Sequence, residues 1–324
     1  MAAKLVLYEW AGDYPPALLE AFTAEFGVTV DYQSYDTQEG AAANIRAGQI
    51  YDVVLLENQL IPALVGDQLL AEIDYHNVPN FKNISPNFRD LAYDPGNRHS
   101  IPATWGTTGL IVDSHGGQPP ITSWNDLWDP AYKGRIVVWD LQRYLIGIAL
   151  KSRGHSANSE DPAELDEALQ RLRELRTQAK ILPYDAASSV EDAKREQADI
   201  FLGWAGDVFR ARESDATITY VLPSEGTLLW GDNWVIPANS PHKAAAEQFV
   251  NYLLRPDVSA QIVNYIFYAT ANEAARALIS QDILNDPVIY PPAKVLQNAE
   301  ILLPLSPAGQ KLSDQIWQQF LASP

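Results

Sequence analysis

The sequence predicts an α/β protein with two domains, each built on a mostly parallel sheet covered by helices. Its length of 324 residues is about twice a common domain size of ~150 residues. Strand and helix patterns alternate through the first 130 residues, and a second alternating series follows Thr108. Such alternation is typical of parallel sheets with helices on both faces.

The first series has the order β-α-β-α-β. Residues 4–9 form an apolar run typical of a strand, and Pro15-Pro16 begin a helix that ends at Gly27. The next elements expected are a strand at 28–32, a short helix at 40–48 and a buried strand at 51–56.

The second series has similar patterns and places an aromatic residue at a strand end. Residues 135–139 predict a strand, and 199–204 predict another that ends in Trp204. Ligands in α/β sheets bind outside the carboxyl ends of strands. Three helix starts are expected, at Asp161-Pro162-Ala163-Glu164, at Ser240-Pro241 and at about Pro307.

Composition excludes several classes of function. The net charge of −18 and pI of about 4.6 argue against nucleic acid as a partner, since no basic surface would replace counterions. The chain has no cysteine and no apolar run of eighteen residues. The start Met1-Ala2-Ala3-Lys4 is too short for a secretory signal, so an exported native protein would have lost its signal.

No residue pattern for catalysis, metal binding or a cofactor stands out. Neither a phosphate-binding glycine loop nor a Gly-x-Ser-x-Gly motif occurs. The histidines are scattered without metal-ligand spacing, at positions His76, His99, His115, His155 and His242. We therefore expect no catalytic residues, no metal and no cofactor.

Three short segments combine aromatic rings with carboxylates. They are Gly203-Trp204-Ala205-Gly206-Asp207-Val208, Leu229-Trp230-Gly231-Asp232-Asn233-Trp234 and Phe267-Tyr268-Ala269-Thr270-Ala271-Asn272. Rings attract an organic cation by their quadrupole and a carboxylate accepts its N–H bonds, so these segments predict an ammonium-binding site. Each residue also has an ordinary interpretation: a tryptophan can be core, and Asp207 can cap a helix.

The same segments resemble the spermidine/putrescine-binding group of ABC-importer substrate-binding proteins. Further motifs in the family's order are Tyr8-Glu9-Trp10, Ser123-Trp124-Asn125-Asp126-Leu127-Trp128, Asn251-Tyr252-Leu253-Leu254-Arg255-Pro256-Asp257-Val258 and Tyr290-Pro291-Pro292. The resemblance implies a two-lobed periplasmic-binding-protein fold of type II, with a ligand cleft between the lobes. Lobe 1 would comprise 1–110 plus 230–285, and lobe 2 would comprise 111–229 plus 286–324.

The resemblance also implies a set of ligand-binding residues. Positions that keep the family's chemistry are Trp10, Trp204, Asp207, Trp230, Asp232 and Tyr268. Other positions depart from it. Ala11 and Gly12 follow the first tryptophan where an acid or polar group is common, and Leu302 replaces a glutamine. The second carboxylate cluster falls on Leu141 and Tyr144, and Glu57 stands where serine is usual. The negative charge for the ligand's second ammonium group would then come from Glu57 or Asp140, or the ligand would carry no second cation.

The resulting hypothesis is a non-catalytic extracytoplasmic receptor, periplasmic or lipid-anchored, that works as a monomer with ABC permease subunits. Its ligand would be a small cationic amine of the putrescine/spermidine type. An alternative ligand is a monoamine or zwitterion such as 4-aminobutyrate. Tyr144 and Leu141 would suit the apolar or neutral tail of such a ligand, and Arg143 could face its carboxylate. Alternatives of other classes are a chemosensory module, a ferric-iron receptor and an enzyme on the same scaffold.

Overall fold

The structure, a computed structural model, describes residues 3–113, 120–185 and 188–323. The chain forms two compact units. Unit 1 comprises Met1–Trp105 and Gly231–Tyr290, and unit 2 comprises Gly106–Trp230 and Pro291–Pro324. The chain therefore passes from one unit to the other three times: within β4 (Ser100–Val112), within β9 (Leu228–Val235) and after Tyr290.

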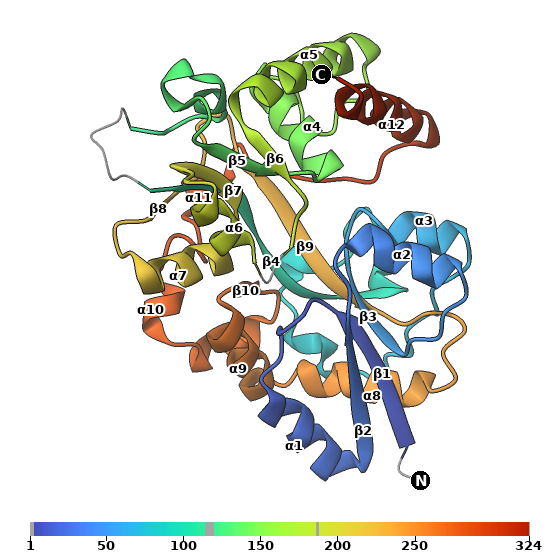
Figure 1. Ribbon diagram of the computed structural model, residues 1–324. Coiled ribbons are helices and arrows are strands. Elements are labelled where there is room, and N and C mark those ends of the chain that lie inside the picture. The colour runs from blue at the N-terminus through green and yellow to red at the C-terminus, as the bar shows by residue number, and fades with distance from the viewer. Residues whose placement is uncertain (1–2, 114–119, 186–187, 324) are drawn as a thin grey trace. The chain divides into compact units, whose positions relative to one another are not determined.

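Unit 1 contains a sheet in which β1 is parallel to both β2 and β3, while β9 is antiparallel to β3 (Figure 1). A two-residue strand, β10, pairs with the first half of β4. The elements are β1 (Ala3–Glu9), α1 (Pro16–Phe26), β2 (Val28–Ser34), α2 (Gln38–Arg46), β3 (Val53–Glu57), α3 (Ile61–Gly66), α8 (Lys243–Leu253), α9 (Pro256–Ile266), β10 (Ala269–Thr270) and α10 (Gln281–Leu284).

Alternation along the strands gives unit 1 a core on each face of its sheet, since successive side chains point to opposite faces. Leu5 and Leu7 of β1 pack on the face covered by α1 and α8. Tyr8 of the same strand packs on the other face, against α2 and α3. Figure 1 shows these two helix pairs on opposite sides of β1 and β3. The unit 1 sheet is therefore packed on both faces, and β1 and β3 end in Glu9 and Glu57.

Unit 2 is built on β5, which is parallel to both β6 and β7. The second half of β4 is antiparallel to β7 and β8, and β11 is parallel to β9. The elements are β5 (Ile136–Trp139), α4 (Gln142–Lys151), α5 (Pro162–Gln178), β6 (Lys180–Leu182), α6 (Ser189–Arg195), β7 (Ile200–Gly203), α7 (Ala205–Ser214), β8 (Thr219–Val221), α11 (Ala293–Leu296), β11 (Glu300–Ile301) and α12 (Pro307–Leu321).

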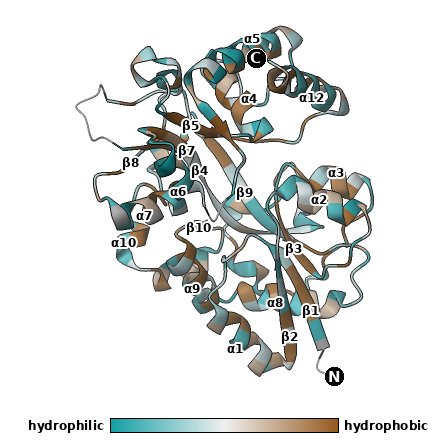
Figure 2. Ribbon diagram, in the orientation of Figure 1, coloured by the Kyte–Doolittle hydropathy of each residue, from teal (hydrophilic) through white to brown (hydrophobic). Residues whose placement is uncertain are grey.

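Short 3-10 helices complete both units. Those of unit 1 are Pro79–Asn83, Pro86–Phe88, Pro95–Asn97 and Glu273–Leu278, and those of unit 2 are Trp124–Trp128 and Pro130–Tyr132. Most lie in the segment that leads to β4 and in the one that precedes β5. Figure 2 shows β5 as hydrophobic and reveals a hydrophilic stretch within β9. β5 therefore contributes only to the core, whereas β9 also carries polar side chains.

Most of the predicted elements are confirmed, and one helix start is wrong. Asp161 caps α5 as predicted, because its Oδ1 accepts hydrogen bonds from the backbone N–H groups of Ala163 (2.8 Å) and Glu164 (3.2 Å). The final helix begins at Pro307 as predicted. The helix expected from Ser240 begins three residues later, at Lys243. The Ser240 hydroxyl donates to buried Asp52 (2.6 Å), and its Oγ accepts from the N–H of His242 (3.2 Å), in front of the helix.

Gly226 in unit 2 has a backbone conformation that other residues rarely adopt. Its φ is +103°, and an added Cβ would overlap the backbone carbonyl of Asn298. Its own carbonyl accepts a hydrogen bond from Trp124 Nε1 (2.9 Å). We expect Gly226→Ala to lower the free energy of unfolding by about 2–4 kcal/mol, from backbone strain plus the steric overlap. Urea unfolding would measure this. Gly66→Ala, which meets no atom within 4 Å, should stay close to wild type.

Candidate functional site

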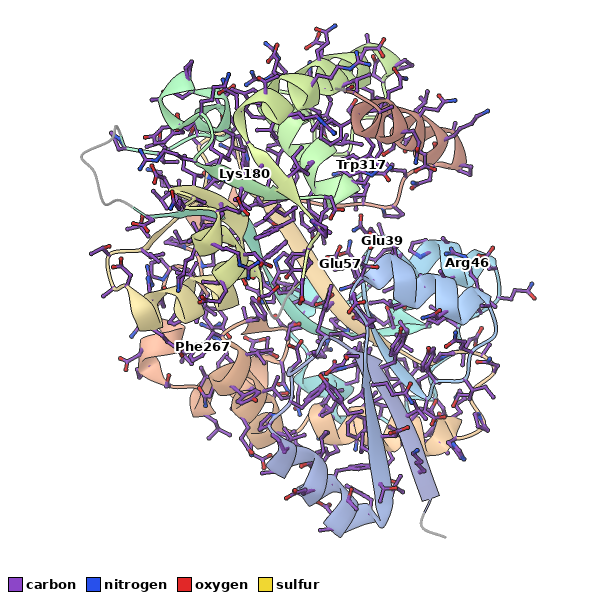
Figure 3. The ribbon with its side chains drawn as sticks, viewed as in Figure 1. Glu39, Arg46, Glu57, Lys180, Phe267 and Trp317 are labelled. Carbon is purple, nitrogen blue, oxygen red and sulfur yellow. The ribbon has the colours of Figure 1, made fainter. Side chains whose placement is uncertain are left out.

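Two carboxylates of unit 1 stand directly opposite one another. Glu57 ends β3, and its partner in the antiparallel register with β9 is Asp232. Figure 3 labels Glu57 at the end of this strand. Like charges at directly opposite positions destabilise a sheet. Such a pair is therefore stabilised when a positive charge binds close to it.

A buried glutamine holds Asp232. The side chain of Gln38, at the start of α2, donates from Nε2 to Asp232 Oδ1 (2.8 Å), and its Oε1 accepts from the backbone N–H of Glu57. Asp232 is 6% exposed. Its other oxygen, Oδ2, accepts no hydrogen bond from any described residue. The structure thus fixes one carboxylate oxygen and leaves the second available to a ligand.

The surroundings of Asp232 favour its neutral form. Burial raises the pKa of Asp232 to about 7, the Gln38 hydrogen bond opposes this shift, and the charge of Asp13 adds to it. A carboxyl that titrates near neutral pH is half charged when nothing is bound. A cation in contact with it would shift the equilibrium toward the carboxylate.

Tyr35 lies near a group of four acidic side chains in unit 1. Burial raises the pKa of Tyr35, and four carboxylates raise it further: Asp232, Glu9, Asp13 and Glu57. The Tyr35 hydroxyl donates to the carbonyl of Leu55 (2.7 Å). The ring of Trp10 meets Tyr35 edge-on at 4.8 Å between centroids. Aromatic rings and concentrated negative charge therefore occur together here, which suits an organic cation.

Tyr268 follows a strained residue. Phe267, labelled in Figure 3, follows the end of α9 in the left-handed region, with φ +59° and ψ +31°, and its N–H donates to the carbonyl of Val263 (3.0 Å). A bulky residue adopts this region rarely, at a cost of roughly 1–2 kcal/mol. The chain then enters β10, where Ala269 pairs with Trp105. The strained turn therefore fixes where the chain turns from α9 into β10, and with it the position of the half-buried Tyr268.

In unit 2, Trp204 is enclosed by two tyrosine rings. It precedes α7 directly, and its indole Nε1 donates to Thr108 Oγ1 (3.1 Å). Tyr144 of α4 meets the Trp204 ring edge-on at 5.8 Å, and Tyr184 does so at 5.0 Å. Trp204 is 7% exposed. The sequence predicted Tyr144 and Trp204 as site residues, and the structure brings these two together within one unit.

Trp230 lies against the same stretch of β4 that holds Trp204. A Cβ added to Gly106 would lie 2.5 Å from Cζ2 of the Trp230 ring, so the indole covers bare backbone there. Thr108, two residues along the strand, binds Trp204. Gly106 is thus required for the position of Trp230, and both indoles depend on residues 106–108.

Asp207 has a structural role that the sequence left open. Its Oδ2 accepts a hydrogen bond from the backbone N–H of Trp204 (3.0 Å), and its Oδ1 accepts one from Ser189 Oγ (2.9 Å). The residue is 1% exposed. Asp207 therefore caps α7 and fixes Trp204, while direct contact with a ligand stays a prediction.

Several residues with a part in these arrangements were not predicted. Gln38 positions Asp232, and Tyr184 completes the rings around Trp204. Gln38 is 194 positions from Asp232, and Tyr184 lies outside the segment that contains Trp204, so neither contact follows a local sequence pattern. Arg143 was considered as a partner for a ligand carboxylate, but its guanidinium donates to Asn158 Oδ1 (3.1 Å) and to the Leu303 carbonyl (3.0 Å).

The described residues contain no group of three or more His, Cys, Asp or Glu side chains that could hold a metal ion. His155 lies beside two glutamates: its Nδ1 is 3.3 Å from Glu164 Oε1 and its Nε2 is 3.1 Å from Glu167 Oε2. His115 is outside the described residues. Within the same described ranges, no helix has an apolar stretch long enough to cross a bilayer.

Comparison with known proteins gives a family and close relatives. The family described as bacterial extracellular solute-binding protein matches residues 17–290. The spermidine/putrescine-binding periplasmic protein of Escherichia coli strain K12 is 35% identical over 303 residues, covering 91% of this chain and 85% of that protein. The putrescine/agmatine-binding protein of Pseudomonas aeruginosa is 28% identical and covers 97% of this chain and 90% of that protein.

Solved structures give the same result. A crystal structure of the spermidine/putrescine ABC transporter substrate-binding protein of Streptococcus pneumoniae has a TM-score of 0.85 and 30% identity, with 98% of each chain covered. A putative spermidine/putrescine ABC transporter from Listeria monocytogenes has a TM-score of 0.91 and 28% identity, with 99% of each covered. The α/β fold of the two-lobed periplasmic binding proteins is therefore confirmed, as is the resemblance drawn from the motifs.

These matches decide the class of the protein. The family match extends over most of the chain, and the Escherichia coli relative exceeds 30% identity over nearly all of it. Members of this family are solute-binding receptors of ABC transporters and not enzymes. The relatives are periplasmic proteins, so this protein is extracytoplasmic. The chain belongs to the bacterial extracellular solute-binding protein family.

Proposed function

We propose that the protein is the polyamine receptor of an ABC importer, with a ligand of the putrescine/spermidine type. The observation that carries the proposal is Asp232, a buried carboxylate with one oxygen fixed by Gln38 and the other available. Its neighbours in unit 1 are acidic and aromatic. The names of the relatives, which specify spermidine, putrescine or agmatine, support the same ligand class.

The proposed ligand-binding residues form one group in each unit. Asp232 and Glu57 of unit 1 hold the ammonium charge, while Trp204 and Trp230 of unit 2 contact the alkyl chain. Trp10, Tyr144 and Tyr268 add aromatic surface, and Asp207 fixes Trp204. A hydrogen bond to a charged group contributes about 1.5–3 kcal/mol, and a cation–π contact about 0.5–2 kcal/mol. A few such contacts reach micromolar affinity or better.

We also propose the mode of action that this family implies. Units 1 and 2 correspond to the two lobes, which close on the ligand by bending at the crossing segments. The closed protein, as a monomer, then docks on the membrane permease subunits. The native protein is periplasmic or attached to the membrane by a lipid.

Charge distinguishes a polyamine from the second candidate, 4-aminobutyrate. The four acids near Tyr35 favour a ligand with more than one positive charge. A zwitterion would need a positive partner for its carboxylate, and the guanidinium of Arg143 already donates to Asn158 and Leu303. Leu302, in place of the family's glutamine, is fully buried. Of the two acids considered for the second ammonium group, Glu57 lies directly opposite Asp232 and therefore serves the same ammonium group, and Asp140 of unit 2 is exposed.

Calorimetric titration of ligand-stripped protein tests the proposal. Putrescine, spermidine, agmatine and 4-aminobutyrate would be titrated separately at neutral pH. Tight binding of one of the first three is the expected result. Binding of 4-aminobutyrate alone would replace the polyamine by a monoamine ligand. Failure of all four to bind would contradict the proposed ligand class and leave the family assignment standing.

The role of Gln38 gives a separate prediction. Its hydrogen bond lowers the pKa of Asp232, so Gln38→Ala should raise that pKa and leave more of the carboxyl neutral at pH 7. We expect putrescine affinity to fall about tenfold, which corresponds to ~1.4 kcal/mol. Titration at a pH about two units higher should restore part of the loss, because the carboxyl ionises there. Gln33→Ala, at an exposed position of the same unit, should bind as wild type does.

A further inference from the structure

Glu9 is a buried carboxyl group that the proposed binding site does not use. It is the last residue of β1 and is 0% exposed. By strand alternation it lies on the same face as Leu5 and Leu7, toward α1 and α8. Neither carboxylate oxygen makes a hydrogen bond of standard geometry with a described residue. Buried polar groups are nearly always hydrogen-bonded, so this exception requires a functional or structural reason.

The groups around Glu9 are acidic side chains and the hydroxyls of two tyrosines. Burial, then the charges of Asp13 and Asp232, raise the pKa of Glu9, and the nearby hydroxyls of Tyr14 and Tyr32 only partly oppose this. Tyr14 accepts a hydrogen bond from Trp234 Nε1 (2.9 Å). The Tyr32 hydroxyl donates to the Trp10 carbonyl and accepts from the N–H of Asp13 (3.2 Å). Lysine, arginine and histidine are absent from the groups that influence Glu9 most.

The two carboxyl groups Glu9 and Asp232 lie on the same face of the unit 1 sheet. Leu7 pairs with Val53, and Glu57 of the same β3 face pairs with Asp232, while Glu9 lies two residues beyond Leu7. Both carboxyl groups are buried, and the charge of Asp232 raises the pKa of Glu9. Neither forms an ion pair with a described residue. Two buried carboxyls that interact, with no cation beside them, cannot both stay ionised, because desolvation and mutual repulsion act in the same direction. The free protein must therefore retain a proton on this pair at neutral pH. A bound ammonium group would remove the reason for retaining it.

We propose that Glu9 is a positioning residue for the bound cation, and that an ammonium group arriving at Asp232 displaces a proton from the Glu9–Asp232 pair into solvent. The carboxyl O–H bond breaks, the proton passes to water, and the ammonium charge takes its place. Glu9 acts through Asp232 and through the local potential, since its own oxygens are enclosed. The inference rests on the proposed function, because it needs an amine ligand at Asp232.

Proton release can be counted by calorimetry. Putrescine would be titrated at about pH 7 into the protein in phosphate and in Tris, buffers of different ionisation enthalpy. Both putrescine amines are already charged there, as an amine of pKa about 10 must be, so released protons come from the protein. We expect wild type to release between about half and one proton per ligand, and Glu9→Gln to release less than half as much. Equal release by both proteins would overturn the role of Glu9.

A matched variant controls for the loss of one negative charge. Glu39 of α2 lies in the same unit but is exposed, and it is labelled in Figure 3. Glu39→Gln removes the same charge as Glu9→Gln. It should leave the number of released protons unchanged. A decrease equal to that of Glu9→Gln would mean that total charge, and not the buried pair, controls proton release.

The pH profile of binding gives the sign of the effect. A group that loses a proton on binding makes affinity rise with pH, up to its pKa in the free protein. Putrescine affinity of wild type should therefore increase between about pH 5 and pH 8, and the increase should be smaller in Glu9→Gln. The two proteins should differ least at the acid end, where Glu9 is neutral with or without ligand. Parallel profiles would contradict the proposal.

A measurement without ligand separates this inference from the proposed function. A carboxyl whose pKa is raised by folding contributes stability that is present below the unfolded pKa of about 4.5 and is lost as pH rises through the folded pKa. Thermal unfolding should therefore show Glu9→Gln gaining Tm over wild type at about pH 8 but not at about pH 4.5. If no amine binds, the proposed function and proton displacement both fail. Binding without proton release would overturn the inference alone.

Discussion

Replacing Asp232 by Asn is expected to weaken putrescine binding at least about 100-fold at neutral pH, which is ~2.7 kcal/mol. The change removes the negative charge and keeps the shape. The asparagine oxygen can still accept from Gln38 Nε2, as Asp232 Oδ1 does. The amide NH2 then occupies the place of Oδ2, where the ligand's own N–H donors would point. A donor facing a donor cannot replace a charge-assisted hydrogen bond of about 1.5–3 kcal/mol.

The fold of this variant should be intact, and its stability gives an internal check. The pKa of Asp232 is raised by burial from an ordinary value near 3.8 to about 7. Its contribution to stability is thus present below about pH 4 and is lost as pH passes through 7. Asp232→Asn should therefore melt at or above the wild-type temperature at pH 8, while calorimetry shows the loss of affinity.

A matched control is available in the same unit. Asp36 is exposed and forms no hydrogen bond or ion pair with a described residue. Asp36→Asn makes the same chemical change away from the proposed site, and it should leave the affinity within about twofold of wild type. Unchanged binding by Asp232→Asn would remove the central residue from the proposal. Equal losses in both variants would point instead to long-range charge.

The strands and most helices could be predicted because their signals are local. The apolar run that predicts β3 is contiguous in the chain, and the Asp161 cap lies next to its helix. The helix expected from Ser240 begins later because Ser240 closes a turn in front of it: its Oγ accepts a hydrogen bond from the N–H of His242 (3.2 Å), while its hydroxyl donates to the distant Asp52 (2.6 Å). A serine pattern alone does not distinguish such a turn from a helix cap.

The site residues show the same distinction. Trp204 and Asp232 were found because their segments combine rings and carboxylates within a few positions. Gln38 was missed, since its contact with Asp232 joins residues 194 positions apart. Glu9 was visible in a motif, but only burial without a hydrogen-bond partner marks it as unusual. Sequence supplies the chemical type of each group, while its protonation depends on neighbours that folding brings close.

Trp204→Ala is expected to have the largest effect in unit 2. Trp204 is buried, its Nε1 donates a hydrogen bond to Thr108 Oγ1, and its ring contacts the rings of Tyr144 and Tyr184. Truncating a buried tryptophan to alanine costs about 3–5 kcal/mol through lost burial and the remaining cavity. Chemical unfolding should show that loss, and calorimetry should show no measurable putrescine binding. Because instability alone could abolish binding, the milder Trp204→Phe is the informative variant.

A second tryptophan of unit 2, Trp139, serves as a control that distinguishes a role in the core from a role in ligand binding. Trp139 is fully buried and also makes one indole hydrogen bond, from Nε1 to the Leu202 carbonyl (2.7 Å). Trp139→Phe and Trp204→Phe should destabilise the protein by similar amounts, about 1–3 kcal/mol, since each loses part of a ring and one hydrogen bond.

Only Trp204→Phe should weaken putrescine binding, by about tenfold, because indole gives the strongest cation–π contact. Equal affinity in both variants would show that Trp204 belongs to the core alone. A selective loss would place an aromatic contact of the ligand in unit 2, as loss in Asp232→Asn would place its charge in unit 1.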